Sequence, residues 1–117
     1  MVLGIDPGLE GGIAVLQDDG LIEATMAIPF VDGTKEVSVV KLSAICMKYK
    51  RTGTLFLERA VPMAMGSKGA FNYGRSFARI QVAIEQSGIK HYLIEPAKWT
   101  KVMHQGIDSD LKAKAKS

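Results

Sequence analysis

Cysteine is almost missing from this 117-residue sequence, because Cys46 is the only one. No disulfide can therefore form within the chain, and the composition fits a reducing compartment such as the cytoplasm. We expect Cys46 to fill space in the core as a small side chain on a helix. Cysteines and histidines do not cluster as zinc ligands do, and no set of Ser, His and Asp suggests nucleophilic catalysis.

Long apolar runs and targeting signals are also lacking. No stretch approaches the roughly 20 apolar residues of a membrane span, and the N-terminus lacks the layout of a signal peptide, so we expect no membrane partner. Hydrophobic residues make up 47% of the chain and charged residues 23%, which is ordinary for a soluble globular protein. We expect residues 1–117 to form one domain with a substantial core.

The charge is unevenly distributed along the chain. Residues 1–58 hold five Lys or Arg and eight Asp or Glu, a net charge of −3, whereas residues 59–117 hold ten and four, a net charge of +6. An acidic half suits cations and a basic half suits phosphates. The pattern favours a nucleic-acid partner, although a solvated surface can show the same moderate excess.

The first predicted strand ends in a carboxylate. An apolar run, Val2–Ile5, leads to Asp6, and Pro7 should end the strand because it cannot donate to a sheet ladder. The glycine-rich stretch 8–12 permits a tight turn and leaves open space beside the carboxylate. A charge at the end of a buried strand needs a partner. A divalent cation is one interpretation, and an aspartate that only caps the turn is the other.

The rest of the chain predicts an α/β layout. We expect strands over 13–17, 21–28, 54–57 and 91–94, and helices over 35–50, 72–87, 96–104 and 110–117. The first three strands are joined by hairpin-type turns, and right-handed crossovers would make strands 2–6, 54–57 and 91–94 parallel. The fold class predicted is a five-stranded mixed sheet, strand order 3-2-1-4-5, with flanking helices.

Two apolar patterns support the predicted elements. In the third strand, alternate residues from Ile22 to Ile28 share one face, which is typical of a half-buried antiparallel strand. In the helix predicted over 35–50, apolar residues recur at three- and four-residue steps. They are Val37, Val40, Ala44 and Met47, flanked by Val39, Leu42, Ile45 and Cys46, and the pattern is typical of a helix.

Strand 54–57 also ends in a carboxylate, Glu58. Parallel neighbours end at the same edge of a sheet, so Asp6 and Glu58 should converge where open α/β sheets place their sites. Mg²⁺ and Mn²⁺ prefer carboxylate oxygen, and these two residues are the candidate metal ligands. Glu95, after the last strand, can either join them or be a solvated strand end.

Three segments together carry a family resemblance. They are Gly4-Ile5-Asp6-Pro7-Gly8, then Leu57-Glu58-Arg59, then Pro96-Ala97-Lys98-Trp99 followed by lysines. In these segments, and over essentially its whole length, the chain resembles the RuvC-like Holliday junction resolvases, above all their small phage-type relatives. These belong to the ribonuclease H-like superfamily. The resemblance implies a ribonuclease H-like fold.

The resemblance also implies a function. Such a protein is a metal-dependent, structure-selective DNA endonuclease that resolves four-way junctions by phosphodiester hydrolysis, in recombination, repair or phage DNA processing. It acts as a homodimer with Mg²⁺ or Mn²⁺, in the cytoplasm of a bacterium or of a phage-infected host. By motif, Asp6 matches the first catalytic acid, Glu58 the second, and Lys112 a lysine ahead of the family's last helix.

The family's remaining one or two carboxylates come from a further C-terminal helix, which would lie beyond Ser117. The resemblance therefore implies that residues 1–117 lack that helix and hold an incomplete active site. Asp108 and Asp110 are alternative sources of the missing carboxylates, or N-terminal helix caps.

Basic and aromatic side chains of the second half are candidates for DNA contact, through phosphates and through stacking on splayed bases. They are Lys68, Phe71, Tyr73, Arg75, Lys98, Lys101 and Lys112. For Phe71 and Tyr73 core packing is the alternative. Arg79 can contact DNA, face solvent or lie at a dimer contact, and Trp99 reads as a core anchor.

Three other functions compete with the resolvase reading. One is a junction-binding module without catalysis, and another is a ribonuclease H-type nuclease on RNA–DNA hybrid, which shares the fold. The third is nucleotide binding, because the glycine-rich stretch after Asp6 also resembles the phosphate loop of actin and sugar kinases. Those proteins need a second lobe that this length cannot supply. The basic second half favours the resolvase branch.

Overall fold

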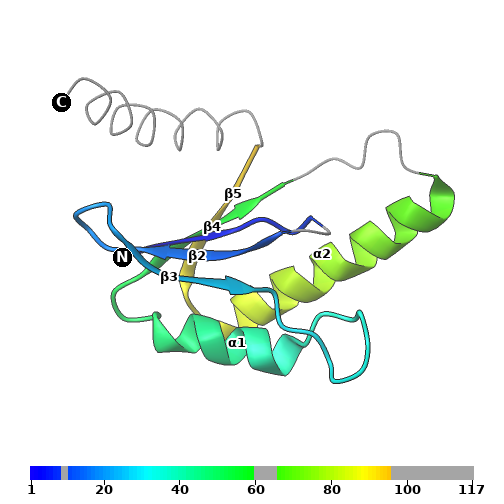
Figure 1. Cartoon of the computed structure of the whole chain (residues 1–117), viewed down its shortest axis with the longest axis horizontal. Coiled ribbons are helices and arrows are strands. Elements are labelled where there is room, and N and C mark those ends of the chain that lie inside the picture. The colour runs from blue at the N-terminus through cyan, green and yellow to red at the C-terminus, as the bar shows by residue number, and fades with distance from the viewer. Residues whose placement is uncertain (9–10, 60–65, 96–117) are drawn as a thin grey trace.

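The structure is a computed structural model that describes residues 1–8, 11–59 and 66–95. Five strands form one sheet, and two helices pack against one of its faces (Figure 1). In chain order the elements are β1 (Val2–Ile5), β2 (Gly12–Leu16), β3 (Ile22–Ala27), α1 (Val39–Lys48), β4 (Thr54–Glu58), α2 (Ser67–Ser87) and β5 (Lys90–Ile94). In this part of the chain, no helix is both long and apolar enough to cross a membrane.

The strand order is β3-β2-β1-β4-β5, which confirms the predicted topology. β2 is antiparallel to both β1 and β3, whereas β1, β4 and β5 are parallel to one another. In the register of β1 and β4, Gly4 lies beside Phe56 and Ile5 beside Leu57. The carboxyl ends of these two central strands therefore meet at the same edge of the sheet.

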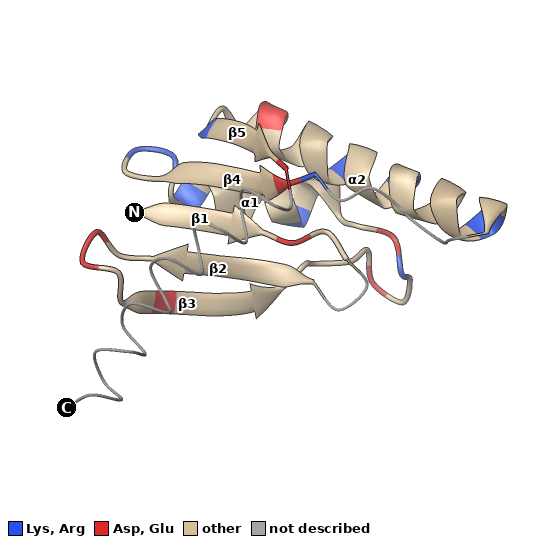
Figure 2. Cartoon of the chain, turned by 90° about the horizontal axis from the view of Figure 1, so that it is seen from above, with Lys and Arg blue, Asp and Glu red and all other residues tan. Residues whose placement is uncertain are grey.

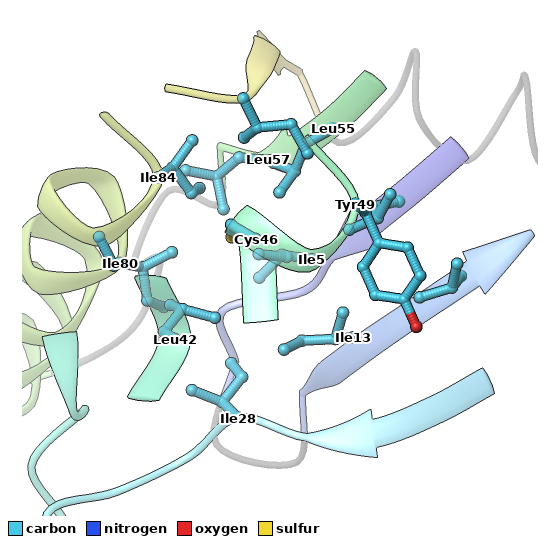
Figure 3. Close-up of a cluster of buried hydrophobic side chains, with 14 of the residues drawn as sticks. Ile5, Ile13, Ile28, Leu42, Cys46, Tyr49, Leu55, Leu57, Ile80 and Ile84 are labelled. Atoms are coloured by element: carbon cyan, nitrogen blue, oxygen red, sulfur yellow. The ribbon is translucent and has the colours of Figure 1, made fainter. Parts of the chain in front are cut away.

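The core fills the space between the sheet and the two helices. Figure 3 shows side chains from β1, β4, α1 and α2 meeting in one cluster. Its fully buried members include Leu3, Ile5, Val15, Leu42, Leu55, Ile80 and Ile84. Cys46, on α1, is 1% exposed, which confirms it as core filler, and burial raises the pKa of its thiol to about 11.

Helix α1 begins four residues later than predicted, at Val39. Ser38 is its N-cap, with an extended backbone and a hydroxyl oxygen that accepts a hydrogen bond from the Lys41 amide at 3.1 Å. Residues 35–37 instead belong to a loop in which Val37 bridges to Phe30. The helix begins here because the Ser38 side chain satisfies a first-turn N–H that has no partner within the helix.

Only some of the apolar residues in the helical pattern of this segment are buried. Val40 is 78% exposed and Met47 is 59% exposed, whereas Leu42, Ser43 and Cys46 are buried. Apolar residues occur all around this short helix, so their spacing alone does not identify the buried face. Packing against α2 and the sheet buries the face that carries Leu42 and Cys46.

Two other boundaries differ from the prediction. Helix α2 begins at Ser67 rather than Asn72, because the Ala70 amide bonds to the Gly66 carbonyl at 2.9 Å and extends the helix backwards. In β3, Ile22 is 67% exposed, although the alternation predicts that it shares the buried face. A register shift after Val15 pairs Leu16 with Ile22, which turns Ile22 to the other side of the sheet. The helices predicted over 96–104 and 110–117 lie outside the described residues.

Candidate functional site

A tight glycine turn presents Asp6 at the end of β1. The Asp6 amide donates to the Gly12 carbonyl at 3.0 Å, and the Gly8 amide donates to the Asp6 carboxylate at 3.0 Å. A Cβ at Gly11 would lie 2.0 Å from the Asp6 carbonyl oxygen, so only glycine fits there. Asp6 therefore caps its own turn while its side chain remains exposed. The capping role and a ligand role are compatible in this geometry.

Glu58 is the last residue of β4 and is half-buried. Asp6 and Glu58 are each the next residue after the paired Ile5 and Leu57, so they leave the sheet at the same edge. Side chains alternate along a strand, so both stand on the face that carries Gly4 and Phe56. Figure 2 shows acidic positions in red at the ends of both strands.

The two carboxylates interact electrostatically. Burial raises the pKa of Glu58, and the negative charge of Asp6 raises it further. Like charges held this close favour either protonation of one carboxyl group or a shared cation. The local electrostatics therefore suit a positively charged ligand.

Two carboxylates fit a hard divalent cation that keeps several waters. Among the described ranges, no group of three or more His, Cys, Asp and Glu side chains is placed to hold a metal ion. Glu95 pairs instead with Arg59 at 3.8 Å, and the Arg59 amide donates to the Ile94 carbonyl at 2.8 Å. Among the described residues, Asp6 and Glu58 are thus the two carboxylates at this edge that could share a divalent cation.

A shallow concavity of about 520 Å³ begins beside Asp6 and runs across β1, β2 and β3. Small residues form much of its wall, including Gly4, Ala14, Thr25 and Ala27. Their size leaves space on this face of the sheet next to the carboxylate edge.

The DNA-contact candidates on α2 fall into two groups. Lys68 is exposed in the first turn, and Phe71 is 69% exposed, so packing in the described core does not explain Phe71. Tyr73 is half-buried, and its ring stacks on Phe77 with the centroids 6.2 Å apart. Phe71 is thus available to a ligand, whereas Tyr73 helps to pack the helix.

The arginines of α2 bind the loop that precedes α1. Arg75 forms a hydrogen-bonded ion pair with Glu36, and Arg79 donates from Nε to the Val37 carbonyl at 2.7 Å. Arg79 also lies 3.8 Å from Glu36. The sequence gives no local signal for these contacts, because the paired residues are about forty positions apart. The remaining candidates, Lys98, Lys101 and Lys112, lie outside the described residues.

The comparisons with known proteins concern structure alone. No family model matches the sequence, and no curated protein matches it. Among solved structures, the chain is similar to T. thermophilus RuvC in complex with Holliday junction substrate, with a TM-score of 0.60 and 16% identity, over 86% of this chain and 67% of that one. It is also similar to a Thermus thermophilus RuvC structure, with a TM-score of 0.49 and 18% identity, over 86% and 66%. The first similarity and the strand order agree with the resemblance seen in the sequence. The chain has the RuvC-like, ribonuclease H-like fold.

Proposed function

We propose that this chain is a metal-dependent endonuclease that binds four-way DNA junctions and hydrolyses their phosphodiester backbone. The observation that carries the proposal is the convergence of Asp6 and Glu58 at one sheet edge of a RuvC-like fold. The solved RuvC neighbour is complexed with a Holliday junction substrate, which supports the choice of DNA.

In this proposal Asp6 and Glu58 hold Mg²⁺ or Mn²⁺. When bound, such an ion polarises a phosphoryl oxygen and lowers the pKa of water. The Gly8 amide orients the Asp6 carboxylate, and the β4–β5 ladder fixes the backbone of Glu58. Because a second ion requires carboxylates beyond these two, we expect the 117-residue chain to bind junctions well and cut them slowly.

Basic side chains of the second half of the chain supply the phosphate contacts in the proposal. Lys98 and Lys101 follow Glu95 by three and six residues in the sequence. Exposed Lys68 and Phe71 on α2 add a phosphate contact and a stacking surface. Lys112 adds charge to the same half of the chain. A four-way junction offers two equivalent strands, which a homodimer can cut symmetrically.

The test uses a labelled four-way junction, a duplex of the same sequence and an RNA–DNA hybrid. We expect tighter binding to the junction than to the duplex, with slow nicking in Mn²⁺. Asp6→Asn should abolish the nicking and preserve binding. Asp32→Asn is the matched control, because Asp32 lies in the loop before α1, where it pairs with Lys41 of that helix, and is remote in sequence from Asp6 and Glu58.

Other results of this assay would indicate a different function or a different site. Junction binding without nicking in any metal would identify a non-catalytic binding module, the candidate that the two-carboxylate site favours next. Preferential cutting of the hybrid would identify a ribonuclease H activity. Nicking that survives Asp6→Asn would refute the assigned site.

A further inference from the structure

The N-terminal half of α2 extends beyond the strands of the sheet (Figure 1). Along this 21-residue helix, contact with the buried core begins at Phe77, and no residue before Ile80 is buried. At 1.5 Å per residue, the ten residues that precede Phe77 span about 15 Å. Core packing therefore fixes the C-terminal half of α2, and the placement of the N-terminal half depends on other contacts.

The same half has few helix-stabilising features of its own. Its N-cap, Gly66, provides no side-chain hydrogen bond, and the first turn contains no acidic residue. Gly69 and Gly74 lie within the helix, where glycine is less favourable than any residue except proline. Such a segment needs tertiary contacts to remain helical and in one position.

Two arginines provide contacts of this kind with the loop before α1. Arg75 forms a hydrogen-bonded ion pair with Glu36, whose carboxylate also lies 3.8 Å from the Arg79 guanidinium. Arg79 donates in addition from Nε to the Val37 carbonyl at 2.7 Å. Glu36 and Arg79 are 33% and 32% exposed, so solvent screens their interaction only in part. Arg75, a candidate for DNA contact, is thus engaged within the protein.

Glu36 is itself held by hydrogen bonds within its loop. The Val31 amide donates to the Glu36 carbonyl at 2.7 Å, and the Glu36 amide donates to the Thr34 hydroxyl at 3.1 Å. The Ser38 amide closes the loop by donating to the Pro29 carbonyl at 2.9 Å. The backbone of Glu36 is thus fixed through both its amide and its carbonyl, and its carboxylate reaches α2 from a defined position.

The two arginines share one side of α2 with two of the candidate DNA contacts. Four residues at steps of three, four and four positions lie along this side, namely Lys68, Phe71, Arg75 and Arg79. Holding Arg75 and Arg79 fixes the rotation of the helix about its axis. It therefore also fixes the direction in which Phe71 and Lys68 face.

We propose that Glu36 is a positioning residue, which holds the N-terminal half of α2 so that Phe71 and Lys68 face the bound DNA. The effect on DNA rests on the proposed function, whereas the effect on the helix does not. Without the Glu36 charge, Arg75 and Arg79 are like charges one turn apart, which destabilises a helix. Loss of this carboxylate therefore releases the helix.

Hydrogen exchange tests the hold on the helix without DNA or metal. In Glu36→Gln and in Arg75→Gln, we expect the amides of residues 71–76 to exchange about two- to fivefold faster than in the parent chain. Amides around Ile84 should exchange as before. Glu23→Gln is the matched control, because Glu23 is exposed on β3 and takes part in none of the ion pairs of the described ranges. Its exchange should equal that of the parent chain.

Junction affinity tests the effect of this hold on DNA binding. Removing a negative charge should by itself tighten binding to DNA, whereas we expect Glu36→Gln to bind a four-way junction about two- to fivefold more weakly than the parent chain. The loss should vanish when Phe71 is already replaced by alanine. This non-additivity distinguishes positioning of Phe71 from general destabilisation, which would weaken binding in both backgrounds.

Several results would overturn the proposal. Unchanged exchange in both Glu36→Gln and Arg75→Gln would show that the ion pair does not hold the helix. Junction binding as tight as the parent's in Glu36→Gln, or an equal loss with and without the Phe71 ring, would contradict the positioning role. If the parent chain binds no junction, the proposed function fails, while the exchange measurement still decides whether Glu36 holds α2.

Discussion

Divalent metal should stabilise the folded chain through Asp6 and Glu58. Burial and the charge of Asp6 raise the pKa of Glu58 in the folded state above its ordinary value of 4.5. A carboxyl group whose folded-state pKa is raised lowers stability as the pH rises from 4.5 through that higher pKa. The unfavourable effect is fully present above that raised pKa, where Glu58 carries its charge. A cation between them should relieve it.

The size of the effect follows from binding linkage. At a metal concentration ten times the dissociation constant, the free energy of unfolding rises by about 1.4 kcal/mol. For a domain near 100 residues, that change raises the melting temperature by roughly 5–10 °C. Thermal unfolding followed by far-UV circular dichroism at pH 7 measures it, with MgCl₂ or MnCl₂ titrated at constant ionic strength so that general screening does not contribute.

Two variants make the measurement specific. Asp6→Asn and Glu58→Gln should lose most of the metal response, and each should melt at a higher temperature than the parent chain without metal, because one of two repelling charges is gone. Asn at position 6 keeps an oxygen for the Gly8 amide, so the turn is preserved. Asp32→Asn should keep the full metal response. An equal metal-induced shift in Asp6→Asn, or a lower metal-free melting temperature in Glu58→Gln, would refute the shared site.

Three further predictions concern the rest of the fold. Leu42→Ala should lower the free energy of unfolding by about 2–5 kcal/mol in urea titrations, because Leu42 is 0% exposed. Val40→Ala on the same helix should change it by less than about 0.5 kcal/mol. The Cys46 thiol, with its pKa raised to about 11, should react with a disulfide reagent at pH 8 far more slowly in native protein than in urea. Arg75→Ala should cost less than about 1 kcal/mol in the same urea titrations, because its ion pair with Glu36 is solvent-exposed.

The topology could be predicted because strong local signals agreed with a chirality rule. Asp18-Asp19-Gly20 turns the chain between β2 and β3, and Gly20 has the positive φ of 87° that this turn requires. The right-handed crossover then leaves one position for β4 beside β1. Each step is local or geometric, so no knowledge of tertiary contacts was needed.

The details that sequence could not supply depend on contacts between distant segments. The buried face of α1 could not be assigned from sequence because Val40 and Leu42 both fit a helical pattern, and only packing against the rest of the fold buries Leu42 and leaves Val40 exposed. The pairing of Glu36 with Arg75 joins a loop to a helix 39 residues later. The electrostatic coupling of Asp6 to Glu58, in contrast, follows from two strand ends and a parallel register. That is why the same two residues could be nominated from sequence.

The sheet itself explains why these two acids act as a pair. Adjacent strands lie about 4.8 Å apart, and Asp6 and Glu58 follow directly after the paired residues Ile5 and Leu57. Two carboxylates in such a register, on one face, cannot move far apart, because a ladder on both sides holds β4 and a glycine turn holds the chain after β1. A fold selected for stability alone would gain by replacing one of them with a neutral residue. Retaining both is reasonable when a cation binds between them and offsets their repulsion. The loss of the metal-induced rise in melting temperature in Asp6→Asn measures this contribution.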